Sequence, residues 1–254
     1  QSSFVYRVRN GKSWVKNGVA SIAICQHNYD FILNYLKKNY SVTNKNVLIP
    51  ENIVYALPTS EKLFVGNIPT GTKIIGEKLA AGIYWENDWG ANDLDLSGLN
   101  IDGKIGWNAT SYQSNNDITY SDDITNAPNG AMEYLYAGNN SKVPTTLAMC
   151  NVYDGDAKTG YKIVVGDGDD VSYDYMMNPN NVILEVKTES VQKNTVLGLF
   201  MQEDNNNRSF TLLNFGAGNA HVSGNSDIST MATKALYEQW KNPLSLASIL
   251  NELG

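Results

Sequence analysis

Short apolar runs separated by polar turns occupy the middle of the chain, from about residue 63 to residue 223. The runs are rich in Val, Ile, Tyr and Thr, and the residues between them are mostly Gly, Asn and Asp. Helical spacing of apolar residues does not intervene, so the pattern predicts an antiparallel β-sandwich or barrel. Ten runs carry this prediction: residues 79–85, 94–99, 104–107, 118–120, 132–136, 145–153, 161–165, 182–186, 196–201 and 210–215.

The first 62 residues predict a small mixed α/β segment. Residues 19–25 form a short apolar run of strand type. Asn28 follows as a candidate helix cap, and the apolar residues between Phe31 and Leu36 then fall on one helical face.

Residues 226–254 predict two short helices. Ser229 is a candidate cap for the first, and Pro243 ends it because proline lacks an N–H donor and clashes with the preceding turn. Ser245 begins the second helix, which carries an apolar stripe. The whole chain is therefore predicted to be α+β, mainly an antiparallel β-sandwich over residues 63–225, with short flanking helical segments.

Charge narrows the classes of partner. The chain has 26 acidic and 19 basic residues and a net charge of -7. This field repels phosphate backbones and anionic lipids, so we expect no nucleic-acid partner. The chain has no apolar run near the roughly 18 residues that a membrane helix needs, so we expect no membrane insertion. We expect a cytoplasmic protein that binds protein partners or itself.

Acidic residues alternate with leucines in the segment Asp93-Leu94-Asp95-Leu96. Successive side chains of a strand point to opposite faces, so both carboxylates are predicted on one face and both leucines on the other. Two like charges this close are unfavourable unless a cation lies between them. Calcium binds six to eight oxygens, and the pair supplies a beginning of such a site.

Further acids follow in the predicted β region, and each could add oxygens to that site. Their spacing is not that of the twelve-residue EF-hand loop, because in the stretch that opens at Asp154 a lysine, Lys158, stands at a ligand position. These acids are Asp122, Asp123, Asp154, Asp156, Asp167, Asp169 and Asp170.

Several of these motifs together resemble the tellurium-resistance TerD family of calcium-binding β-sandwiches, over residues 65–225. The sequence 93–97 is similar to the family's D-L-D-x-S motif, and 121–125 stands where the family has G-D-N-L-T. Gly130 and Glu133 fall at the family's glycine and glutamate of the next acidic loop. The softer matches are residues 71–73 with 81–85, at the family's opening hairpin, and residues 208–218, at its closing strand.

The resemblance implies a non-enzymatic calcium-binding or scaffold module of the kind found in stress-response and phage-associated systems. It implies that Asp93, Asp95, Asp122, Asp123 and Glu133 hold the calcium ion. The chain departs from the family at residues 127–132, where Ala-Pro-Asn-Gly-Ala-Met replaces further acids. We therefore expect a fold of the family type with fewer metal ligands.

Two other classes of function stay open. The chain begins with Gln1, which is compatible with a processed structural protein of a virion or another large assembly. Acids and tryptophans lie together at Trp85, Glu86, Asp88 and Trp89, which would suit a carbohydrate-binding sandwich. We expect no enzyme, because the chain has only two histidines, His27 and His221, and lacks the nucleophile-elbow and zinc-binding motifs.

Overall fold

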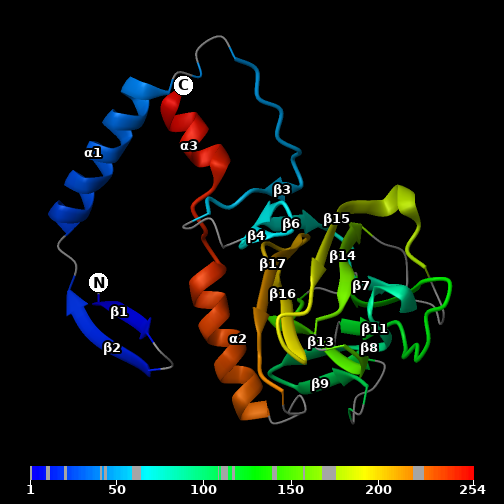
Figure 1. The fold of residues 1–254 in the computed structure, drawn as a ribbon. Coiled ribbons are helices and arrows are strands. Elements are labelled where there is room, and N and C mark those ends of the chain that lie inside the picture. The colour runs from blue at the N-terminus through cyan, green and yellow to red at the C-terminus, as the bar shows by residue number, and fades with distance from the viewer. Residues whose placement is uncertain are drawn as a thin grey trace. The chain divides into compact units, whose positions relative to one another are not determined.

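The computed structural model describes residues 2–9, 12–19, 22–40, 42, 45–58, 64–107, 109, 114–115, 118–138, 142–156, 158–167, 176–219 and 226–254. The chain divides into two compact units (Figure 1). One comprises residues 1–48 and 247–254, and the other comprises residues 49–246. The predicted boundaries at residues 62 and 225 both fall inside the larger unit.

Two antiparallel sheets form the larger unit. The six-stranded sheet has the order β10 (Ser114–Asn115), β11 (Ile118–Tyr120), β12 (Ala131–Ala137), β7 (Leu79–Trp85), β14 (Gly160–Asp167) and β15 (Val182–Glu189). The seven-stranded sheet has the order β3 (Ile53–Val54), β6 (Lys73–Gly76), β17 (Arg208–Gly216), β16 (Asn194–Gln202), β13 (Thr146–Gly155), β8 (Ala91–Asn100) and β9 (Gly103–Gly106). A small hairpin of β4 (Phe64–Val65) and β5 (Ile68–Pro69) and two short 3-10 turns, η1 (Asn87–Trp89) and η2 (Pro179–Asn181), complete the β region.

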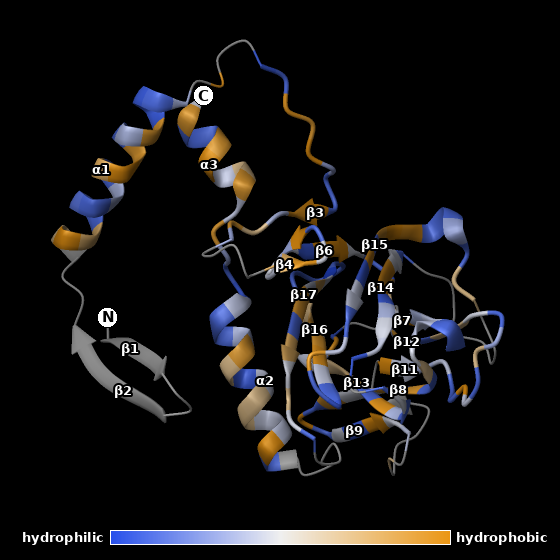
Figure 2. Ribbon diagram, viewed as in Figure 1, coloured by the Kyte–Doolittle hydropathy of each residue, from blue (hydrophilic) through white to orange (hydrophobic). Residues whose placement is uncertain are grey.

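The main hydrophobic core lies between these two sheets, because its buried residues come from both of them. Leu94 and Leu96 of β8 and Ile83 and Trp85 of β7 all belong to this core, and all four are fully buried. Hydrophobic residues are concentrated on the strands, and the connecting loops are more hydrophilic (Figure 2). The predicted α+β fold with a dominant antiparallel β-sandwich is confirmed, and each of the ten apolar runs overlaps a strand.

Helix α2 (Ser226–Trp240) covers the outer face of the seven-stranded sheet. Its Leu236, Tyr237 and Trp240 pack on a second buried cluster of strand residues that includes Leu99 and Leu147. The helix begins three residues before the predicted cap and ends, as predicted, ahead of Pro243. Helix α3 (Leu246–Leu253) follows Ser245, as predicted.

The smaller unit contains a hairpin of β1 (Ser2–Arg9) and β2 (Lys12–Val19), followed by helix α1 (Ile22–Asn39). The prediction of a strand-type run over residues 19–25 was wrong, because α1 begins at Ile22 and Asn28 lies inside it. A short apolar run has no periodicity that separates a strand from the first turns of a helix. Among the described residues, no helix has the length and apolar character needed to cross a membrane.

Candidate metal centre

Strand β8 presents Asp93 and Asp95 on the face opposite its two core leucines. Leu94 and Leu96 point into the space between the sheets, and the strand alternation turns the two aspartates the other way. Both aspartates are nevertheless buried, with only 6% of Asp93 and 2% of Asp95 exposed. The predicted placement of two carboxylates on one face and two leucines on the other is therefore what the structure has.

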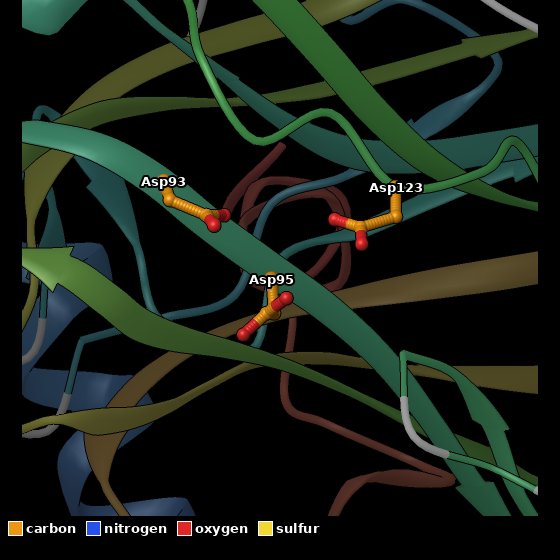
Figure 3. A group of neighbouring side chains, drawn as sticks. All are labelled: Asp93, Asp95 and Asp123. Carbon is orange, nitrogen blue, oxygen red and sulfur yellow. The ribbon is translucent and has the colours of Figure 1, made fainter.

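Asp123 joins this pair from a different part of the chain. It lies on the loop between β11 and β12, and its carboxylate is turned toward those of Asp93 and Asp95 (Figure 3). Asp122, immediately before it, has a left-handed backbone with φ of 94°, and its Oδ1 accepts the N–H of Asp123 at 2.8 Å. Aspartate tolerates this conformation because its short side chain can bond to the neighbouring main chain.

Asp93, Asp95 and Asp123 form a group that we call the aspartate cluster. One carboxylate oxygen from each lies within 4.8 Å of the other two. Within the part of the chain that the structure describes, three of the cluster's oxygens are buried and have no hydrogen-bond partner: Asp93 Oδ1, Asp95 Oδ2 and Asp123 Oδ1. Buried polar atoms in native proteins nearly always have a partner, so these three orphaned oxygens require an explanation.

Electrostatics agrees with the geometry. Burial, and then the charges of Asp123 and Asp154, raise the pKa of Asp93 to about 6. Burial, and then the neighbouring charge of Asp93, raise the pKa of Asp95 to about 7. The pKa of Asp123 is also raised, first by burial and then by Asp122. Ionisation of all three carboxylates is therefore unfavourable unless a positive charge compensates them.

Two lysines offset part of this repulsion. The charges of Lys104 and Lys193 lower the pKa of Asp95, although less than burial raises it. Lys104 is itself half-buried on β9, and burial lowers its pKa. Neither lysine forms a direct ion pair with the cluster among the ion pairs of the described residues. The site keeps a strong excess of negative charge.

Three convergent carboxylates suit a hard divalent cation. Calcium takes oxygen ligands at about 2.3–2.6 Å, so two oxygens on the same ion lie at most about 5 Å apart. The oxygen separations in the aspartate cluster satisfy this limit. Asp123 is only half-buried, which leaves a side from which water can complete the coordination.

Glu133, the other predicted ligand, lies close by but is used differently. It is fully buried, and its carboxylate accepts hydrogen bonds from Tyr120 Oη, Leu96 N and Ile124 N at 2.6, 2.8 and 2.9 Å. Burial raises its pKa well above the ordinary value even though these three bonds oppose that effect. The structure brings Asp93, Asp95 and Asp123 together and leaves Glu133 and Asp122 outside the group.

The remaining predicted acids are not part of the cluster, although Asp154 is the partner of Asp93 in the pairing of β13 with β8. Asp154 accepts a hydrogen bond from Asn92 at 2.9 Å, and Asp167 accepts one from the N–H of Lys78 at 3.1 Å. Asp156 is exposed. Asp169 and Asp170 are outside the described residues.

Trp85 and Trp89, the tryptophans considered for carbohydrate binding, both pack against other parts of the protein. Trp85 is fully buried, and its Nε1 donates to the carbonyl oxygen of Asn92 at 3.2 Å. Trp89 packs against the main core, and Lys187 Nζ lies 4.2 Å from its ring centroid. His221, one of the two histidines considered above, is outside the described residues.

Sequence reasoning missed the two lysines whose charges act on Asp95. Lys104 stands opposite Leu99 on the strand next to β8, so strand pairing could have placed it on the aspartates' face. Lys193 lies in the turn before β16, and no pattern in the sequence predicts that it lies near the cluster. Comparison of the chain with protein-family models and with curated proteins gives no match.

Proposed function

We propose that this chain is a non-enzymatic, calcium-binding β-sandwich module, in which a cation held by the aspartate cluster orders one end of the sandwich. The carrying observation is the set of three buried carboxylate oxygens that converge without hydrogen-bond partners among the described residues. A dication would satisfy these oxygens and neutralise the charges that raise their pKa values.

The resemblance to the TerD family supports the same proposal from the sequence. Its D-L-D-x-S motif falls on β8 and supplies Asp93 and Asp95, and its second acidic motif supplies Asp123. Gly130, at the family's loop glycine, has φ of 89°, and a Cβ there would collide with the Tyr84 hydroxyl. The proposal includes a cytoplasmic location and protein partners, with a structural protein of a virion as the alternative.

In this role the chain's own residues bind and orient the metal. Asp93 and Asp95 supply oxygens from a rigid strand, and Asp123 supplies one from the loop. Bound calcium would keep the carboxylates ionised and draw the loop of residues 121–130 onto β8. A surface ordered in this way could then be recognised by a protein partner.

Thermal unfolding of the full chain, in millimolar calcium and in excess chelator, tests the proposal. A ligand present at about a hundred times its Kd stabilises the native state by roughly 2.7 kcal/mol. For a chain of this size we expect the melting temperature to rise by several degrees, at about 2–4 °C per kcal/mol.

The site is located by a pair of matched variants. The double variant Asp93→Asn, Asp95→Asn should lose the calcium-dependent rise, and Asp88→Asn, which neutralises an exposed acid on η1, should keep it. A wild-type melting temperature that is the same in calcium and in chelator would refute the calcium proposal and favour the structural-assembly alternative.

A further inference from the structure

Glu133 lies on β12, in the sheet opposite the one that carries Asp93 and Asp95. Along β12 the residues Met132 and Tyr134 belong to a cluster on the outer face, and Ala131 and Leu135 belong to the core between the sheets. Glu133 has the same alternation parity as the core residues, so its carboxylate points into the interior of the sandwich. A charged group in such a place is retained only if its hydrogen bonds are made.

The carboxylate makes those bonds to the main chain on both sides of the aspartate cluster. Its Oε2 accepts the N–H of Leu96, the residue after Asp95, and its Oε1 accepts the N–H of Ile124, the residue after Asp123. Tyr120 Oη donates a third bond, to Oε2, from the end of β11. One side chain thus holds the two ligand-bearing segments at a fixed separation.

The N–H of Leu96 is free to bond to Glu133 because strand β9 ends before it reaches this residue. Strand β9 pairs with β8 only from Ser97 to Asn100. The N–H of Leu96 lies beyond that ladder and donates to Glu133 instead. The segment of β8 that bears Asp93 and Asp95 is therefore anchored on this side by Glu133.

We propose that Glu133 is a positioning residue of the metal centre and not one of its ligands. The inference rests on the function proposed above and specifies how the site is assembled. A carboxylate offers about four lone-pair positions, and three of those on Glu133 are taken by main-chain and tyrosine donors. A metal ion bound there would have to displace the bonds that bring the aspartates together.

Europium(III) luminescence on the full chain distinguishes a ligand from a positioning residue, because lifetimes in H₂O and D₂O count the water molecules on the bound ion. For Glu133→Gln we expect one ion per chain and an unchanged number of bound waters. The calcium affinity should fall about 10- to 100-fold, the usual loss when a residue that orients metal ligands is replaced. Asp123→Asn, the ligand control, should add at least one bound water to the ion.

The outcomes separate the two proposals. An extra water on europium in Glu133→Gln would make Glu133 a ligand, and an unchanged calcium affinity would remove its positioning role. If the wild-type chain binds neither ion, the proposed function fails and the role of Glu133 fails with it. If Glu133→Gln does not fold, Tyr120→Phe serves instead: it keeps the carboxylate, removes one donor, and should weaken calcium binding by about 3- to 10-fold with no added water. A calcium affinity equal to wild type in Tyr120→Phe would overturn the inference.

Discussion

Glu133 and the aspartate cluster are neighbouring groups of buried carboxylates at one end of the sandwich, and they differ in whether their oxygens have hydrogen-bond partners. Glu133 is fully buried and accepts three hydrogen bonds. In the aspartate cluster Asp93 and Asp95 are nearly as buried and Asp123 is half-buried, yet an oxygen of each of the three residues has no hydrogen-bond partner among the described residues. The first group is satisfied from within the chain, and the second is the one for which we propose a cation as partner.

The difference lies in what each group does for the fold. A satisfied buried carboxylate joins segments and adds stability, since removing it leaves its donors without partners. An unsatisfied cluster costs stability until a cation compensates it.

Removal of the satisfied acid should have the greatest effect on stability. Glu133→Ala removes the carboxylate that accepts the Leu96 N–H, Ile124 N–H and Tyr120 O–H bonds, and it opens a cavity in the core. We expect the free energy of unfolding in chelator to fall by about 3–5 kcal/mol. Chemical denaturation measures this, and Glu189→Ala, at an exposed position on β15, should change stability by less than about 0.5 kcal/mol. A loss no larger than that of the control would mean that the three hydrogen bonds contribute little.

The unsatisfied acids should make the metal-free protein less stable as pH rises. The pKa values of Asp93 and Asp95 are raised from 3.8 to about 6 and about 7, so between pH 4 and pH 7 the native state binds more protons than the unfolded state. The free energy of unfolding should therefore fall as the pH rises from 5 to 7. We expect a fall of roughly 2 kcal/mol, less than the pKa shifts alone imply, because solvent at the rim screens part of the repulsion.

Denaturation in chelator at a series of pH values measures this fall. Saturating calcium should reduce or reverse it, because the bound ion favours the ionised carboxylates. A metal-free protein whose stability rises steadily from pH 5 to pH 7 would contradict the raised pKa values of the cluster.

Neutralising a single cluster residue should separate stability from binding. At pH 8 in chelator, Asp95→Asn removes one buried negative charge from a repulsive group, so we expect the free energy of unfolding to rise by about 1 kcal/mol. In calcium the same variant should bind at least about tenfold more weakly, because it lacks a ligand. Calorimetric titration and denaturation of the same sample check both signs, and a loss of stability in chelator would contradict the repulsion argument.

The smallest expected effect concerns Lys104, whose charge acts on Asp95. A positive charge beside the cluster competes with the cation, so Lys104→Gln should strengthen calcium binding by about two- to fivefold at low ionic strength. Lys142→Gln, which removes the same charge at an exposed position, is the matched control. The gain should shrink in high salt, and a gain that salt does not alter would point to a change in shape instead of charge.

Much of the sandwich could be predicted from the sequence because each strand has its own local pattern. Run 79–85 coincides with β7, and the alternation at 93–96 correctly divided carboxylates from leucines. The N-terminal hairpin was missed, although Asn10-Gly11 between two apolar runs is a common hairpin signal. The run at 19–25 was misread because it spans the end of β2 and the start of α1.

The site was less predictable because it depends on contacts between sheets. Asp122 and Asp123 are adjacent residues of the same type, so the sequence does not distinguish them, yet only Asp123 belongs to the cluster, next to the left-handed backbone at Asp122. The family resemblance placed Glu133 among the metal ligands. Its position on the inward face of a buried strand instead indicates a carboxylate that accepts hydrogen bonds from within the protein. The spacing of residues along a strand predicts which face of the sheet a side chain lies on. It does not predict how close that side chain comes to residues of the other sheet.

The position of Asp123 has a mechanical consequence. Asp93 and Asp95 belong to the seven-stranded sheet, whereas Asp123 follows a strand of the six-stranded sheet. A cation bound by all three would therefore link the two sheets at the edge of the sandwich, next to the segments that Glu133 holds together. Sliding of the layers under tension would then have to pull the ion from its oxygens. Calcium would thus set the force that the domain withstands as well as its equilibrium stability.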